Sequence, residues 1–134
     1  MRAIPRDLSR WAVLLAFVLP SAACIAAAAA TGAAGAVYAT TRGVESLVNS
    51  PVDQVASRVP PAMDKLEIVQ TGKSSDDSGA MREFKGTHGD LDVSIQLERQ
   101  DSAMTKVEVS ARKNVAEWDK DFARQVLEEI LQQR

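Results

Sequence analysis

The sequence predicts an α+β protein: a two-layer sandwich in which two helices cover one face of a mainly antiparallel sheet, in the order strand, helix, four strands, helix. The strongest observation is the strict alternation of apolar and polar residues over 91–99 and 104–112, which is typical of strands with one dry and one wet face. The second is the C-terminal stretch, where apolar residues recur in steps of four, as in an amphipathic helix. At 134 residues the chain holds at most one such domain.

The first strand is predicted over 43–48, and a helix follows it from Ser50. This serine is expected to cap the helix, Pro51 to take the first helical position, and Asp53 to complete a capping box near the positive helix end. The apolar face of this helix comprises Val52, Val55, Ala56, Val59 and Met63.

Two consecutive prolines interrupt this first helix. Pro60 disfavours helical geometry at Val59, and neither Pro60 nor Pro61 can donate a backbone hydrogen bond. The sequence therefore predicts a break or sharp kink near Val59, followed by a second short turn through Met63.

The remaining strands are predicted from alternation and from the turn residues between them. They are expected over 65–71, 80–86, 91–99 and 104–112, with turns at 72–79 and 87–90 and a hairpin link at 99–103. The last helix is expected to begin near Asn114, as its cap, and to cover the dry face of the sheet. Its apolar residues are Trp118, Phe122, Val126 and Ile130, flanked by Val115 and Leu127.

The N-terminal region has the three parts of a secretory signal peptide. A basic start is followed by a bulky apolar stretch at 11–19 and by small residues that end at Ala23, and no charge occurs from 11 to 41. The sequence predicts a signal peptide over 1–23, with cleavage between Ala23 and Cys24.

Cys24, the only cysteine, directly follows these small residues. This position is similar to the lipobox of bacterial lipoproteins, where the sulfur receives a diacylglyceryl group, although Ser21 stands where Leu is usual. Several acyl chains on one residue make a stable membrane anchor. Ordinary signal-peptidase cleavage and an uncleaved N-terminal anchor are the alternatives. Ile25 is not the Asp that favours inner-membrane retention, so the outer membrane, on its periplasmic side, is the expected location.

The predicted domain organisation is a signal peptide (1–23), a lipidated Ala/Gly-rich tether (24–42) and an α+β domain (43–134). Without its first 23 residues the chain carries 13 basic and 17 acidic side chains, a net charge of −4. This mildly acidic body, which lacks a basic stripe, argues against binding to nucleic acid and to anionic lipid head groups.

The chain resembles small lipoproteins of Gram-negative bacteria that are grouped under a domain of unknown function. The similar features are the Cys after "AA" at the end of the signal, the Ala/Gly tail and an aromatic residue, Tyr38, before the first strand. Further features are "SPVDQV" (50–55), "DDSGAM" (76–81), "GDLDVSIQL" (89–97) and "ARQVLEEI" (123–130). The resemblance implies a location in the cell envelope and this fold, and it implies no catalytic residue and no cofactor.

The sequence offers few residues for a chemical site. His88, the only histidine, is expected to be a polar turn residue, because neither a second histidine nor a free cysteine is available to share a metal with it; Asp90 and Asp92 are its only nearby acids. The "KSSDDSG" run lacks the ligand spacing of a calcium loop. We therefore expect no catalytic residue, no metal site and no cofactor.

Two classes of function remain open. The first is a non-enzymatic, lipid-tethered structural or protein-interaction module of the envelope, which meets a protein partner through the polar sheet face or a sheet edge. The alternative is a periplasmic module that binds a small apolar ligand or lipid between the first helix and the sheet. A large apolar cavity favours this alternative, and a solid core favours the first class. The residues expected to line such a cavity are Val59, Met63, Leu91, Val93 and Trp118.

Overall fold

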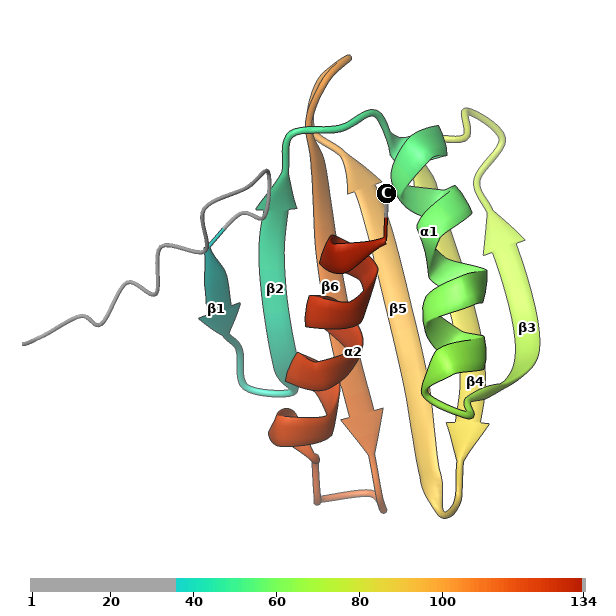
Figure 1. Ribbon diagram of the computed structural model, residues 1–134. Coiled ribbons are helices and arrows are strands. Elements are labelled where there is room, and N and C mark those ends of the chain that lie inside the picture. Colours follow the sequence, from blue (N-terminus) through green and yellow to red (C-terminus); the bar gives the residue numbers. More distant parts are fainter. Residues whose placement is uncertain (1–35, 134) are drawn as a thin grey trace, which may run out of the picture.

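Six antiparallel strands form one sheet, and helices α1 and α2 lie on one face of it (Figure 1). This computed structural model describes residues 36–133. It confirms the predicted α+β sandwich and its order of strand, helix, four strands and helix. The expected signal peptide, with Ala23 and Cys24, and residues 24–35 of the expected tether lie outside the described residues.

The strands lie across the sheet in the order β1-β2-β6-β5-β4-β3. Strands β3 to β6 are joined as consecutive hairpins, whereas the pairing of β2 with β6 joins segments far apart in the sequence. The strands are β1 (Val37–Ala39), β2 (Gly43–Val48), β3 (Val69–Ser75), β4 (Met81–His88), β5 (Leu91–Arg99) and β6 (Thr105–Arg112). The helices are α1 (Val52–Lys65) and α2 (Lys120–Gln132).

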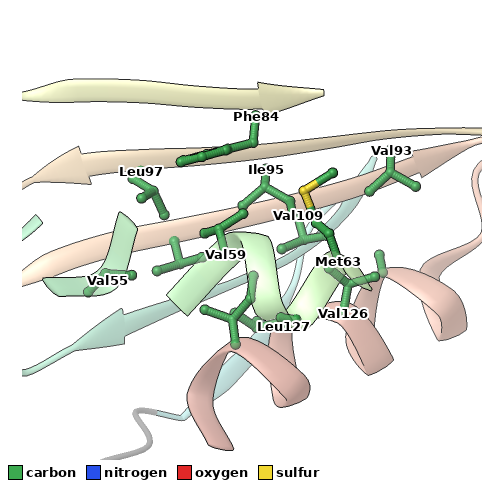
Figure 2. Packing of buried hydrophobic residues seen from close by; sticks show 14 of the residues in the cluster. Val55, Val59, Met63, Phe84, Val93, Ile95, Leu97, Val109, Val126 and Leu127 are labelled. Atoms are coloured by element: carbon green, nitrogen blue, oxygen red, sulfur yellow. The ribbon is translucent and has the colours of Figure 1, made fainter. Parts of the chain in front are cut away.

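The hydrophobic core lies between the sheet and the two helices (Figure 2). The strands β5 and β6 were predicted within one residue, and their apolar residues all face this core. Removing such side chains from water is the main favourable term in folding. Core residues seen in the figure include Val55, Val59, Met63, Phe84, Ile95, Leu97, Val109 and Leu127.

The predicted break at Pro60 and Pro61 is wrong. Helix α1 runs without interruption from Val52 to Lys65, with both prolines inside it. Both rings are exposed, so neither disturbs the packing of the helix against the sheet. The buried stripe of the helix therefore continues to Met63.

The predicted capping box is also wrong, because both of its side chains bond to groups other than the helix start. Pro51 is the N-cap and makes no side-chain capping bond. The Ser50 hydroxyl accepts a hydrogen bond from Arg58 Nη2 at 3.2 Å. The Asp53 carboxylate pairs with Arg82 on β4 instead of with its own helix.

Strand β3 begins at Val69, four residues later than predicted, because α1 continues through Lys65. The chain then reverses through Glu67, which has a left-handed backbone (φ 55°). Strand β3 also extends to Ser75, so the predicted turn at 72–79 is confined to 76–80, and β4 extends to His88.

Helix α2 begins at Lys120 and is capped by Asp119, whose Oδ1 accepts a hydrogen bond from the Phe122 backbone N–H at 2.8 Å. The expected cap, Asn114, belongs to the preceding loop. There its Oδ1 accepts bonds from two backbone N–H groups at 3.0 Å. Val115, expected to flank the apolar face, is 94% exposed in this loop.

Strand β1 is an additional element that the alternation pattern does not reveal. It covers only Val37–Ala39, within the expected tether, and pairs with β2. The sheet therefore includes residues before the expected boundary at 43.

Candidate functional site

The sheet face opposite the two helices is not covered by any element of residues 36–133 (Figure 1). We call it the open face. It carries the side chains that alternate with the core residues of each strand. These are Tyr38 on β1, Glu45 and Leu47 on β2, Val69 and Ser74 on β3, Met81, Glu83, Lys85 and Thr87 on β4, Asp92, Ser94, Gln96 and Glu98 on β5, and Lys106, Glu108, Ser110 and Arg112 on β6.

Cross-strand pairing places open-face residues in rows that run perpendicular to the strands. One of these, which we call the glutamate row, crosses all six strands; directly opposed side chains in such a row have their Cβ atoms about 4.5–5.5 Å apart. Its members, in order, are Tyr38, Glu45, Glu108, Gln96, Glu83 and Ser74. Three carboxylates thus lie in one line across the open face.

Every basic side chain of the open face is paired with an acidic one. The pairs are Lys85 with Glu83 (3.4 Å), Lys106 with Glu98 (2.7 Å) and Arg112 with Asp92 (3.4 Å). Two acids of the face, Glu45 and Glu108, form no ion pair within the described part of the chain. These two lie directly opposite each other on β2 and β6, an arrangement that destabilises a sheet.

The Lys106 ammonium lies among several of these carboxylates. Its hydrogen bond with Glu98 raises the pKa of Lys106, and the nearby charges of Glu45 and Glu108 act in the same direction. The same hydrogen bond lowers the pKa of Glu98. One cation therefore serves three carboxylates at this place, and negative charge remains in excess.

A shallow hollow of about 310 Å³ lies in the open face beside the β3–β4 turn. Met81, Gln96 and Glu108 are among the residues that line it. The turn itself is held by Asp76, which accepts hydrogen bonds from the Ser78 hydroxyl (2.7 Å) and the Met81 N–H (3.1 Å). These bonds, that from Ser78 first, lower the pKa of Asp76. The carboxylate thus stabilises its own turn.

Apolar side chains flank the charged centre of the open face. Tyr38 is 57% exposed, Leu47 is 43% exposed and Met81 is 52% exposed. Tyr38 lies directly opposite Glu45, and Leu47 directly opposite Lys106. The open face therefore combines surplus negative charge with accessible apolar area.

The expectation for His88 is wrong. This residue ends β4 and is half-buried, and its ring stacks on that of Phe122 in α2 with the centroids 4.5 Å apart. Its Nδ1 lies 3.4 Å from the Glu67 carbonyl oxygen. Asp90 and Asp92 are exposed, as expected. Among residues 36–133, no group of three or more His, Cys, Asp or Glu side chains is placed to hold a metal ion.

A second hollow, of about 340 Å³, lies along the loop between β6 and α2. Mainly charged residues line it, together with Trp118. The Arg42 guanidinium lies over the Trp118 ring, 5.9 Å from its centroid, so this tryptophan packs at the periphery and not within the core.

Three of the five residues expected to line an apolar cavity lie instead in the packed core. Val59, Met63 and Val93 are buried members of the core cluster (Figure 2). At Gly86, directly opposite Val93, a Cβ atom would come within 2.6 Å of Ile68 Cγ2 and 2.7 Å of Met63 Cε. The space between α1 and the sheet is therefore filled to contact at this point.

Sequence reasoning missed the opposition of Glu45 and Glu108. Alternation alone places Glu108 on the wet face, but only the pairing of β2 with β6 brings Glu45 opposite it. No local signal encodes that pairing. Ala23 and Cys24, the predicted cleavage and lipidation residues, lie outside residues 36–133.

Within the described part of the chain, no helix combines the length and apolar character needed to span a bilayer. Comparison of the chain with protein-family models, with curated proteins and with solved structures finds no match.

Proposed function

We propose that this chain is a non-enzymatic, lipid-tethered protein of the bacterial cell envelope that binds a protein partner through the open face of its sheet. Signal cleavage between Ala23 and Cys24 leaves Cys24 as the acylated first residue. The Ala/Gly-rich segment after it then holds the domain on the periplasmic side of a membrane, with the outer membrane favoured.

The interaction role rests on the difference between the two sheet faces, of which one is covered by helices and the other is not. Helices α1 and α2 cover one face completely enough to bury its apolar residues. The other face combines accessible Tyr38, Leu47 and Met81 with the surplus charge of Glu45 and Glu108. Exposed apolar area next to polar groups is typical of protein-binding surfaces.

The packing at Gly86 supports this role over the alternative, a carrier of a small apolar ligand. Such a carrier needs an apolar cavity of some hundreds of Å³. The contacts that a Cβ at Gly86 would make with Ile68 and Met63 leave no room for a methyl group there. Neither of the two hollows described above lies between α1 and the sheet: one is in the open face and the other lies along the loop between β6 and α2.

The position of His88 supports a role without catalysis. A general base must lie within hydrogen-bond reach of the proton that it removes from a nucleophile or substrate. The His88 ring is stacked on Phe122, and the polar group beside its Nδ1 is a backbone carbonyl, which has no proton to give up.

The membrane anchor is tested by replacing Cys24 with Ser. We expect Cys24→Ser to release the protein from membranes after a carbonate wash, while circular dichroism shows the domain still folded. The matched variant Ser21→Leu keeps the sulfur and should remain in the membrane fraction. A Cys24→Ser protein that still sediments with membranes contradicts lipidation and favours an uncleaved anchor.

The interaction surface is tested by a photo-cross-linking side chain placed at Gln96, in the middle of the glutamate row. The matched control position is Gln125, which is exposed on α2. In native envelopes we expect a defined protein adduct from position 96 and none from position 125. Equal labelling from both positions contradicts a partner site on the open face.

A further inference from the structure

We propose that the partner presents a basic segment to the open face, and that lysine or arginine side chains of this segment pair with Glu45 and Glu108. This inference rests on the proposed function and adds the chemical class of the partner. It depends on the charge balance of the open face, on the position of the two surplus carboxylates and on the apolar groups around them.

The charge balance leaves two carboxylates without an ion pair of their own, because the cation near them, Lys106, is hydrogen-bonded to Glu98. The open face carries three bases, and each lies within 3.4 Å of one acid. The acids that remain are Glu45 and Glu108, and they are direct cross-strand neighbours. Two adjacent like charges on a sheet lower its stability. A cation delivered by a partner converts this repulsion into attraction.

This charge pattern favours one class of binding partner for the open face over the others. A second copy placed face to face adds two more surplus carboxylates, so self-association through this face is disfavoured. Nucleic acids and anionic lipid surfaces are repelled for the same reason. A bare divalent cation needs more oxygen ligands than two carboxylates supply. A polypeptide with closely spaced lysines or arginines meets both the charge and the extent of the face.

The surroundings of the two glutamates suit long basic side chains. Tyr38, opposite Glu45, offers an exposed ring beside a carboxylate, an arrangement that binds the apolar stem and the cationic head of arginine together. On the other side, Glu108 lines the hollow of about 310 Å³ that reaches Met81. This hollow can take an apolar side chain next to the paired cation. The basic segment is therefore expected to carry apolar residues as well.

The test uses the full-length chain in native envelopes, with the photo-cross-linker at Gln96. The first variant combines Glu45→Gln with Glu108→Gln. The control combines Asp64→Asn with Glu128→Gln, which makes the same charge change at exposed helix positions. The adducts are digested, and the partner peptide attached at position 96 is sequenced.

We expect a partner peptide in which Lys and Arg outnumber Asp and Glu. The adduct yield should fall roughly 2- to 30-fold in the Glu45/Glu108 variant, as the loss of two exposed ion pairs predicts, and stay unchanged in the control. Added salt should lower the yield of the parent chain. The urea midpoint of the Glu45/Glu108 variant should not fall, because two repelling charges have been removed. If these residues had only a structural role, the urea midpoint of the variant would fall.

Two results overturn the inference in different ways. A protein adduct whose peptide is neutral or acidic, or whose yield is the same in both variants, refutes the basic segment and leaves the proposed function intact. No adduct, or adducts to lipid or glycan only, refutes the inference and the proposed interaction role together.

Discussion

Gly86 is a residue of the sheet against which a side chain of α1, Met63, packs directly. It lies on the core side of β4, and Met63 and Ile68 occupy the space that a side chain would need. Gly72, on the neighbouring strand β3, differs in this respect: a Cβ atom there would meet only Lys85 Cβ, at 3.8 Å. The two glycines form a matched pair for measuring how tightly the core is filled.

We expect Gly86→Ala to lower the free energy of unfolding by about 1–3 kcal/mol, because the added methyl group overpacks the core. Gly72→Ala should be neutral or slightly stabilising, since the methyl group fits and the unfolded chain loses entropy. Urea denaturation of both variants measures the difference. Equal midpoints for the two variants contradict a filled core at Gly86.

His88 joins the end of β4 to α2 through its stack on Phe122. Because stacked aromatic pairs contribute about 0.5–1.5 kcal/mol beyond burial, we expect His88→Ala to lower the free energy of unfolding by about 1 kcal/mol. Asp90→Ala, two residues away in the exposed turn, should change it by less than about 0.5 kcal/mol. Thermal melts that do not distinguish the two variants show that the stack contributes nothing.

At the scale of the elements, α2 is fixed by its buried aliphatic residues and by one ion pair to α1. Leu127, Val126 and Ile130 are fully buried, whereas Phe122 is half-buried and Trp118 precedes the helix. The carboxylate of Glu129 accepts a hydrogen bond from Lys65 Nζ at 2.9 Å. The aliphatic residues and the ion pair can be tested separately.

Leu127→Ala should lower the free energy of unfolding by about 2–5 kcal/mol, the usual cost of emptying a buried leucine site. Trp118→Ala should cost less, although tryptophan is the larger side chain, because its ring lies outside the core cluster, with the Arg42 guanidinium over it. Guanidinium denaturation of both variants gives the comparison. A larger loss for Trp118→Ala contradicts the placement of this residue outside the core.

Acid unfolding tests the link between the helices. The hydrogen bond from Lys65 lowers the pKa of Glu129 below its usual value of 4.5. Because the folded pKa is the lower one, Glu129 stabilises the fold above its unfolded pKa and loses this effect as the pH falls through its folded pKa. The urea concentration at the unfolding midpoint should therefore decrease as the pH is lowered below about 5. This decrease should be less steep for Glu129→Gln than for the parent chain. Glu128→Gln, an exposed neighbour, should keep the parental slope; equal slopes for both variants contradict the link.

The elements also show what the sequence can predict. Strands β5 and β6 were predicted closely because one face is buried and the other is solvated, which imposes a period of two on their residues. Strand β3 was misplaced because nearly all its side chains are exposed and its sequence has no such period. The helix starts were predicted wrongly because the side chains expected to cap them bond to other groups. These side chains are Ser50, Asp53 and Asn114.

The candidate surface was only partly predictable. Alternation indicated a polar sheet face, but the opposition of Glu45 and Glu108 depends on the pairing of β2 with β6 across the intervening helix and hairpins. Contacts of this kind are decided by the packing of the whole domain, and local propensity does not contain them. The same holds for Gly86, whose tight surroundings come from α1 and from the segment before β3.

In the molecule as a whole, we propose that the two faces of one sheet have different roles. The face beneath α1 and α2 is a filled core that keeps the sheet in shape (Figure 2). The open face carries the groups that we propose to contact a protein partner. A membrane anchor at Cys24 would confine this face to the envelope and raise the local concentration of a partner in the same membrane.

Native mass spectrometry of the full-length protein, released from its envelope in mild detergent, tests this assignment most directly. The proposed function predicts the mass of the chain from Cys24 onward with its covalent acyl groups, either alone or increased by the mass of a bound protein partner. A further small apolar molecule, bound at one copy per chain and lost only when the domain unfolds, would contradict the filled core and establish the protein as a carrier.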